Sequence, residues 1–421
     1  MKFKKIILKN SLPVFLVKIP KAKSATVLAM YKTGSRYENR KNSGLSHFLE
    51  HMFFKGTKKR PTTLKISGGL DSIGAEFNAF TGKEYTGYYV KSQKAKFGIA
   101  LDILSDMLIN SKFEQEEIDR ERGVIMEELN MYEDNPMMYI EDVFEGCLYG
   151  DTPAGWDTIG FKENILKLQR KDFLNYFSSQ YGVKSMGLFV AGDFEEKNIK
   201  KELNEKFAGI KKNNYKNKIK VVEKQKEPCF KVKRKKTDQM TISLGFRSFP
   251  AGHKDEMILK LLSIILGGSM SSRLFIELRE RGGLAYYVHS GAEFYSDSGY
   301  ISVQAGIPKN KLKESMEVIL DQYKLLKTEM VSKEEITKAK DLLSGKMILG
   351  LEGTDDFTSW YGRQFPFSDK FLSPDEFLKK MKKVSVEDIM RVSKNIFTND
   401  RLNLAVIGDD FKFDLKKYLK V

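Results

Sequence analysis

The sequence is poor in several residue patterns that would place it in common protein classes. Its 421 residues include only two cysteines, Cys147 and Cys229, far apart and without Cys-x-x-Cys spacing. This usage fits a reducing compartment and two unpaired thiols rather than a disulfide framework. No stretch approaches the roughly 18 to 20 apolar residues of a membrane span. The basic start also lacks the apolar run and cleavage site of a signal peptide. We therefore expect a cytoplasmic protein without a membrane partner.

Histidine is scarce as well, yet two of the four histidines lie close together. The apolar spacing of residues 43–57 predicts a buried amphipathic helix that ends at Gly56. His47 and His51 are one turn apart, so both imidazoles project from one face, and Glu50 lies beside them. This His-x-x-Glu-His pattern is a zinc-protease signature. A lone buried histidine is more often a hydrogen-bonded core residue, but a pair at this spacing favours a metal site. Glu50 is then available as a base on a metal-bound water.

A formal net charge of +16 raises the alternative of a basic nucleic-acid-binding protein. The excess is mostly local, because residues 211–236 hold eleven Lys and one Arg against Glu223 and Glu227, a net charge of +10. The Lys- and Asn-rich composition is typical of a solvated linker, and the part from Cys229 on resembles an edge strand. No aromatic-interleaved basic motif accompanies the charge. We therefore expect no nucleic-acid partner, and a salt-dependent gel shift would test that alternative.

The remaining patterns predict alternating strands and helices. Clusters of β-branched and apolar residues indicate strands at 5–8, 14–18 and 25–31, before the motif helix, and two strands joined by a short turn within 74–90. A helix is expected from about residue 63, with others near 94–109, 114–132, 138–148 and 171–181. The strand 186–191 and a charged helix near 195–206 complete the first half.

The second half repeats this plan. A Gly-Ala-Glu-Phe run at 291–294 echoes the one at 74–77, and Glu-Glu-Ile at 334–336 echoes 116–118. We therefore expect an α+β fold of two homologous domains, each a mixed β-sheet flanked by helices. Their bounds are 1–210 for the metal-binding domain, 211–228 for the basic linker and 229–421 for the second domain. The second copy lacks the histidine motif, and aligning the Glu-Glu-Ile triplets sets Lys346 opposite Glu128.

A catalytic zinc needs a third protein ligand, and the long helix near 114–132 offers several carboxylates. Glu121 and Glu128 are two turns apart and share a face, whereas Glu127 is turned about 100° away. Composition alone favours a solvated acidic helix face, because Glu-rich helices are common. The residues by themselves leave this choice open.

At this point the chain resembles the inverzincin peptidases of the pitrilysin/insulinase family, especially short-chain bacterial members similar to the mitochondrial processing peptidase. The likeness covers nearly the whole chain. It is carried by the histidine motif with Glu128, by Asn78-Ala79-Phe80-Thr81 with Glu84 and Tyr88, and by the run from Leu278 to Tyr286. Gly282 departs from the family, whose members often have a longer residue there, but the spacing of Arg279 and Tyr286 is unchanged.

The resemblance implies a role for each matching residue. His47, His51 and Glu128 would be the ligands of one Zn²⁺ per active site, with Glu50 as general base and Glu121 orienting a ligand. Arg279 and Tyr286 match the family's Arg and Tyr pair, which would stabilise the oxyanion or hold substrate backbone. The strand with Asn78, Ala79 and Phe80 would receive a peptide by edge addition.

Members of the family enclose substrate in a chamber of four such domains, and this chain has two. The resemblance therefore further implies a homodimer that encloses short or unfolded peptides in a closed chamber. The alternative within this family is a non-catalytic subunit of a processing-peptidase-like assembly. Intact ligands, base and Arg/Tyr pair favour the zinc endopeptidase.

Overall fold

The computed structural model describes residues 2–409 and 414–421, which form two compact units. Neither unit is continuous in sequence. Unit 1 contains residues 1–129, 157–219 and 350–371, and unit 2 contains residues 130–156, 220–349 and 372–421. Each unit therefore includes one segment from the other half of the sequence, residues 350–371 in unit 1 and residues 130–156 in unit 2. The linear bounds of the two homologous domains, 1–210 and 229–421, remain a prediction.

Unit 1 is built on a six-stranded sheet in the order β1-β2-β6-β3-β5-β4. Its strands are β1 (Lys2–Ile7), β2 (Pro13–Lys18), β3 (Ser24–Tyr31), β4 (Glu76–Thr81), β5 (Thr86–Gln93) and β6 (Met186–Gly192). All neighbours are antiparallel except the parallel pair β2 and β6. Each of these strands overlaps its predicted range, because a sheet with two covered faces gives near-continuous apolar runs that are readable locally.

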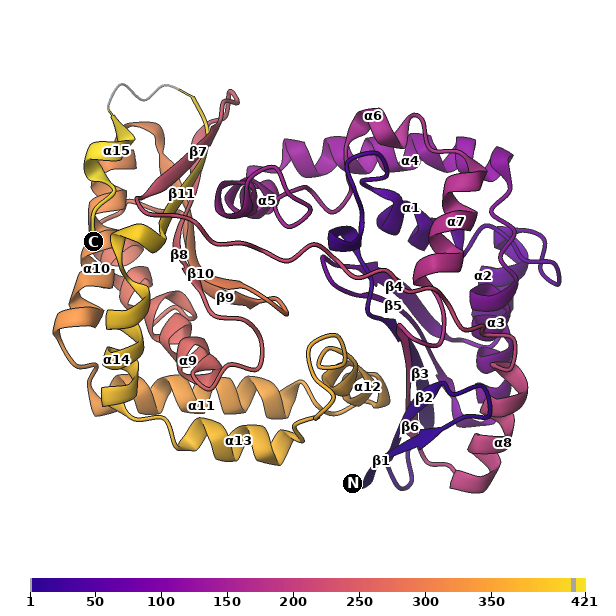
Figure 1. Ribbon diagram of the computed structural model, residues 1–421. Coiled ribbons are helices and arrows are strands. Elements are labelled where there is room, and N and C mark those ends of the chain that lie inside the picture. The colour runs from indigo at the N-terminus through magenta and orange to yellow at the C-terminus, as the bar shows by residue number, and fades with distance from the viewer. Residues whose placement is uncertain (1, 410–413) are drawn as a thin grey trace. The chain divides into compact units, whose positions relative to one another are not determined.

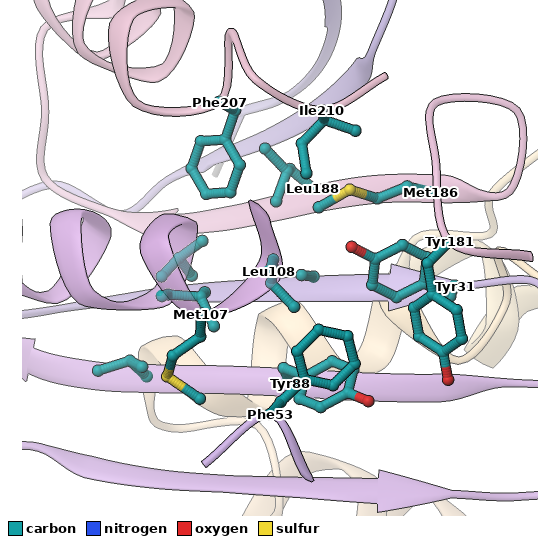
Figure 2. Packing of buried hydrophobic residues seen from close by; sticks show 14 of the residues in the cluster. Tyr31, Phe53, Tyr88, Met107, Leu108, Tyr181, Met186, Leu188, Phe207 and Ile210 are labelled. Carbon is teal, nitrogen blue, oxygen red and sulfur yellow. The ribbon is translucent and has the colours of Figure 1, made fainter. Parts of the chain in front are cut away.

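The helices of the first half cover one face of this sheet (Figure 1). They are α1 (Leu45–Met52), α2 (Thr63–Asp71), α3 (Phe97–Asn110), α4 (Gln115–Asp134), α6 (Lys162–Ile165), α7 (Arg170–Gln180) and α8 (Glu196–Lys206). Their core includes aromatic contacts, with the rings of Phe53 and Tyr88 4.9 Å apart and those of Tyr31 and Tyr181 4.7 Å apart (Figure 2). This packing fixes α1 on the sheet.

Each sheet takes the cover of its other face from the opposite half of the sequence. In unit 1 this cover is α12 (Thr354–Gly362), whose Phe357 and Tyr361 pack on Phe15 and Phe189. In unit 2 it is α5 (Pro136–Tyr149), which packs on the strands with Phe144 and other apolar residues. The boundary between the units falls within α4, after Leu129.

Unit 2 has a five-stranded sheet in the order β7-β11-β8-β10-β9. Its strands are β7 (Cys229–Lys233), β8 (Gln239–Ser248), β9 (Tyr287–Phe294), β10 (Gly299–Pro308) and β11 (Leu402–Ile407). Its other helices are α9 (Glu256–Gly267), α10 (Leu312–Thr328), α11 (Lys333–Leu349), α13 (Pro374–Lys382), α14 (Val386–Ile396) and α15 (Leu415–Tyr418). The edge strand expected from Cys229 on is confirmed as β7.

The repeat is confirmed in architecture, but one of the two sequence echoes is out of register. The Glu-Glu-Ile triplets lie at the same place near the starts of α4 and α11. The Gly-Ala-Glu-Phe runs do not correspond. The two repeats can be aligned by matching the end of β5 at Gln93 with the end of β10 at Pro308. In this alignment the strand pairings make Asn78 of β4 correspond to His289 of β9. Short local identities therefore misled the alignment at this point.

The start of the basic segment is largely exposed, as its composition predicts, but a few of its residues anchor it on unit 1. Asn213 is buried and donates to the Ser179 carbonyl at 2.9 Å, while the Tyr215 hydroxyl donates to the Lys32 carbonyl at 2.6 Å. Lys218 forms an ion pair with the buried Glu84 at 3.3 Å. Composition missed these anchors because the partners are distant in sequence.

No helix within residues 2–409 and 414–421 has both the length and the apolar character needed to cross a bilayer.

Candidate metal centre

Helix α1 is held at both its N-terminus and its apolar face. Gly44 precedes it with φ of 98°, a conformation that favours glycine. The buried carboxylate of Glu38 accepts hydrogen bonds from the backbone N–H groups of Gly44 and Ser46, at 2.8 and 2.6 Å. Phe48 and Leu49 are fully buried, and the Phe48 ring lies 4.9 Å from that of Phe173 on α7. These contacts fix the direction in which the polar face of the helix points.

That polar face brings His47 and His51 together with Glu128 of α4. One ligand atom from each of the three residues lies within 4.8 Å of the others, the one such cluster found among residues 2–409 and 414–421. Nε2 of His47 is 3.6 Å from Oε1 of Glu128, and Nε2 of His51 is 3.5 Å from Oε2. His47 is 8% exposed, and the other two are half-buried.

The chemistry of this donor set fits Zn²⁺. Ligand atoms around a tetrahedral zinc at about 2.0–2.1 Å lie roughly 3.3 Å from each other, close to the separations seen here. Two imidazoles and one carboxylate also form the three-ligand set of catalytic zinc sites, which leave a fourth position open. Both imidazoles turn Nε2 towards the carboxylate, as a shared ion requires.

Glu121, two turns before Glu128 on α4, contacts the back of one imidazole. Its Oε1 lies 2.9 Å from Nδ1 of His51, and its other oxygen forms an ion pair with Nζ of Lys55. Burial raises the pKa of Glu121, but the hydrogen bonds from His51 and Lys55 outweigh it and lower the pKa. Burial lowers the pKa of His51, and the bond to Glu121 with the charge of Glu128 outweighs that effect, so it is raised. Glu121 is thus hydrogen-bonded to His51 on the side of the ring away from Glu128.

Glu50 lies between the two histidines in sequence and is not part of the three-residue cluster. Its Oε2 is buried and has no hydrogen-bond partner in the described part of the chain. A buried carboxylate oxygen without a donor is costly, so an unmatched acceptor beside a metal cluster points to a function. The buried Tyr88 and Tyr181 are close enough for the charge of Glu50 to contribute to raising their pKa values, after the larger effect of burial.

The predicted peptide-binding residues lie on an outer strand of unit 1. Asn78, Ala79 and Phe80 belong to β4, the edge of the sheet, which packs against α1. Ala79 faces the core beneath α1, whereas Phe80 packs on the opposite face. An edge strand leaves one row of backbone groups available for pairing.

Arg279 and Tyr286 belong to unit 2, outside the metal cluster of unit 1. Arg279 lies on a π-helix, η3 (Phe275–Arg281), which ends at Gly282, and Gly283 has φ of 55°. Tyr286 precedes β9, and its backbone N–H bonds to the Gly306 carbonyl at 3.0 Å. Its side chain is 74% exposed, with the Arg279 guanidinium 5.9 Å from the ring centre. Strand β9 begins at the next residue, Tyr287.

Two residues of this centre were not predicted to have roles from the sequence. Lys55 lies one turn beyond His51, a spacing that could have suggested a contact on the same side. Glu38 precedes α1 by a loop, and its capping contact depends on how that loop folds.

Comparison with protein families decides what kind of protein carries this centre. Residues 13–159 match the insulinase family of peptidases (peptidase family M16), and residues 167–343 match the peptidase M16 inactive domain. The chain belongs to peptidase family M16.

Similar M16 proteins and solved structures agree with this. The chain is 34% identical over 392 residues to an uncharacterised zinc protease, YmxG, of Bacillus subtilis, covering 93% of this chain and 95% of that one. It is also 34% identical over 408 residues to an uncharacterised zinc protease of Rickettsia felis, covering 95% and 96%.

The fold matches a protease from Helicobacter pylori with a TM-score of 0.92 at 24% identity, covering 97% of this chain and 99% of the other. It also matches a Pseudomonas fluorescens structure described as a peptidase M16 inactive domain, with a TM-score of 0.90 at 16% identity, covering 98% and 100%. Both confirm the predicted fold of two mixed α/β domains. Family membership and the names of the relatives support a zinc metallopeptidase that acts on peptides.

Proposed function

We propose that this M16 protein is a zinc endopeptidase that cleaves short or unfolded peptides, with the metal held by His47, His51 and Glu128. The observation that carries the proposal is the convergence of both Nε2 atoms on the Glu128 carboxylate. Bound zinc would supply a Lewis acid that polarises the scissile carbonyl and acidifies water.

Glu50 accepts the proton of the attacking water and passes it to the leaving amine. Its buried Oε2 without a hydrogen-bond donor supports this role, because an engaged carboxylate would be a poorer base. Its position one residue before His51 keeps it beside the proposed metal.

The edge strand β4 binds substrate by pairing with the peptide backbone, which gives broad sequence tolerance. Its place next to α1 supports this proposal. Tyr286, with Arg279 beside it, donates to the oxyanion or holds the substrate backbone. The exposed Tyr286 side chain is available for such a contact.

The quaternary structure that goes with this function is a homodimer whose closed chamber admits unfolded chains and excludes folded proteins. Digestion of a mixed peptide library, with and without a chelator and with zinc added back, tests the function directly. Cleavage that the chelator abolishes and zinc restores is the expected result. A chain that binds zinc stoichiometrically and cleaves nothing would instead be a non-catalytic subunit.

A further inference from the structure

Glu121 uses its two oxygens for two different partners on one short stretch of chain. Oε1 faces Nδ1 of His51, and the other oxygen pairs with Nζ of Lys55, in the turn that follows α1. The Glu121 side chain is 8% exposed and that of Lys55 is 22% exposed. The backbone N–H of Lys55 bonds to the Met52 carbonyl at 3.2 Å, so the turn itself holds the lysine near α4.

A carboxylate in this environment needs a second partner. Ile118 and Ile125 are fully buried on the same helix, and His51 engages only one of the two oxygens. Without Lys55, the second oxygen would be left with a large desolvation cost, and the carboxylate would be free to rotate away from His51. This rotation would weaken its hold on Nδ1 of His51 and therefore on the direction of the Nε2 lone pair at the metal position.

We propose that Lys55 is a positioning residue for the metal centre, which acts through Glu121 to fix the orientation and tautomer of His51. The proposal rests on the proposed function, because it assumes that His51 binds zinc. It assigns a role to a residue that contacts none of the three ligands directly.

The experiment measures zinc affinity by competition with a chromophoric chelator, independently of peptide cleavage. Lys55→Met keeps the length of the side chain but removes its charge, and should lower zinc affinity about 10- to 100-fold. Lys55→Arg keeps the positive charge and should retain most of the zinc affinity of the parent. Lys59→Met is the matched control, because it removes the same charge nearby, where Lys59 pairs with Asp102 at 2.5 Å. It should change the affinity less than about 2-fold.

A double-mutant cycle separates positioning from general damage. Glu121→Gln should weaken zinc binding by itself, and Lys55→Met should then cause no further loss, because its route to His51 is already broken. Equal affinity of Lys55→Met and the parent, or additive losses in the double variant, would overturn the proposal. A parent chain that binds no zinc would overturn the proposed function itself, so the two failures are distinguishable.

A second inference comes from the two cysteines, which are separate in sequence but adjacent in unit 2. Cys147 on α5 and Cys229 at the start of β7 both lie next to Asn403 of β11. Asn403 pairs in register with Cys229, and its Oδ1 is 3.9 Å from Sγ of Cys147. The two elements that carry the thiols, α5 and β7, also pack against each other. The two residues are present as free cysteines, as expected from the sequence, but they are neighbours.

Their environments differ in the way that thiol exchange requires. The nearby Cys147, together with the charge of Arg247, lowers the pKa of the half-buried Cys229 to about 6. The nearby Cys229 and burial raise the pKa of Cys147. Cys229 is therefore the nucleophilic thiolate and Cys147 the protonated partner beside it.

We infer that Cys229 and Cys147 form a redox-active dithiol that reacts with low-molecular-weight disulfides. The Cys229 thiolate attacks one sulfur of the disulfide RSSR, forming a mixed disulfide and releasing RS⁻. RS⁻ takes the proton of Cys147, and the resulting thiolate attacks Cys229 and expels a second RS⁻, which is protonated by solvent. The two cysteines lose two electrons in total, and RSSR is reduced to two thiols.

Treatment of the native chain with glutathione disulfide, followed by acid quenching, alkylation and peptide mass spectrometry, tests this inference. The expected product is a peptide pair linked through Cys147 and Cys229 that dithiothreitol separates. Cys147→Ser should instead accumulate glutathione on Cys229, whereas Cys229→Ser should leave Cys147 unmodified. Absence of the linked pair in the parent, or equal modification of Cys147 in Cys229→Ser, would overturn it.

Discussion

Lys346 occupies in α11 the position that Glu128 occupies in α4, because each residue follows the start of its helix by the same number of residues. Burial lowers the pKa of His289, and the positive charge of the nearby Lys346 lowers it further. A cation at this position repels a metal ion, whereas the carboxylate in unit 1 attracts one. Unit 2 therefore keeps the scaffold of the repeat without the charge of a metal site.

This difference predicts about one zinc per chain, held through Glu128. Glu128→Gln should reduce zinc affinity by at least about 10-fold, because it removes a charged ligand from a three-ligand site. Glu127→Gln is the matched control, since Glu127 is the adjacent exposed residue on α4 and should leave the affinity unchanged. Metal analysis after dialysis against a weak chelator measures both. The reverse order of the two variants would contradict the ligand assignment.

The proposed base should be separable from metal binding. Glu50→Gln keeps the shape of the side chain but cannot accept a proton, so zinc content should be unchanged while kcat falls about 10²- to 10⁴-fold. The measurement is peptide cleavage by zinc-loaded protein, with metal content determined on the same sample. Activity above about 1% of the parent rate, at equal zinc content, would rule out Glu50 as the base.

The sequence predicted those parts of the centre that depend on local spacing. His47, Glu50 and His51 share one short helix, so helical periodicity alone shows that the two imidazoles project together. The third carboxylate could not be chosen in this way, because Glu121 and Glu128 share a face of α4. Only the packing of α4 against α1 shows that Glu121 meets Nδ1 of His51, while Glu128 lies opposite both Nε2 atoms.

Contacts between distant segments were not readable either. The apolar faces of α5 and α12 show that these helices are buried, but not which sheet they cover. The second face of each sheet needs an apolar cover, and in both units a helix from the other half of the sequence supplies it. For the same reason the sequence did not bring Cys147 next to Cys229, or Lys218 next to Glu84.

Glu38, which accepts hydrogen bonds at the start of α1, makes the stability of the folded protein depend on pH. Burial raises its pKa to about 7, although the N–H groups of Ser46 and Gly44 and the charge of Lys83 act in the opposite direction. Because the folded-state pKa lies above the unfolded value, its contribution to stability is fully present below about pH 4.5 and is lost as the pH rises through 7.

The unfolding free energy of the parent, relative to Glu38→Gln, should therefore decrease between pH 5 and pH 8, by up to roughly 3 kcal/mol. Urea unfolding of the zinc-free proteins measures this difference without linkage to metal binding. Glu127→Gln serves as the control for loss of an exposed carboxylate. A difference between parent and Glu38→Gln that stays constant across this range would refute the prediction.

The last prediction concerns how unit 2 takes part in cleavage. Tyr286 lies in the repeat without metal ligands, so its hydroxyl can affect chemistry only at a metal centre carried by a unit 1. Tyr286→Phe should leave zinc content and folding unchanged and lower kcat by the roughly 10²- to 10³-fold expected for one oxyanion donor. The measurement is single-turnover cleavage of a peptide, beside zinc analysis and circular dichroism.

Mixing Tyr286→Phe chains with Glu50→Gln chains distinguishes a shared site from one completed within a single chain. If the chain forms the proposed homodimer and one subunit supplies Tyr286 to the other, some mixed dimers contain one intact site and activity returns. Mixing each variant with itself under the same conditions is the control. No recovery, once subunit exchange has been demonstrated with labelled chains, would mean that Tyr286 acts within its own chain or has a structural role.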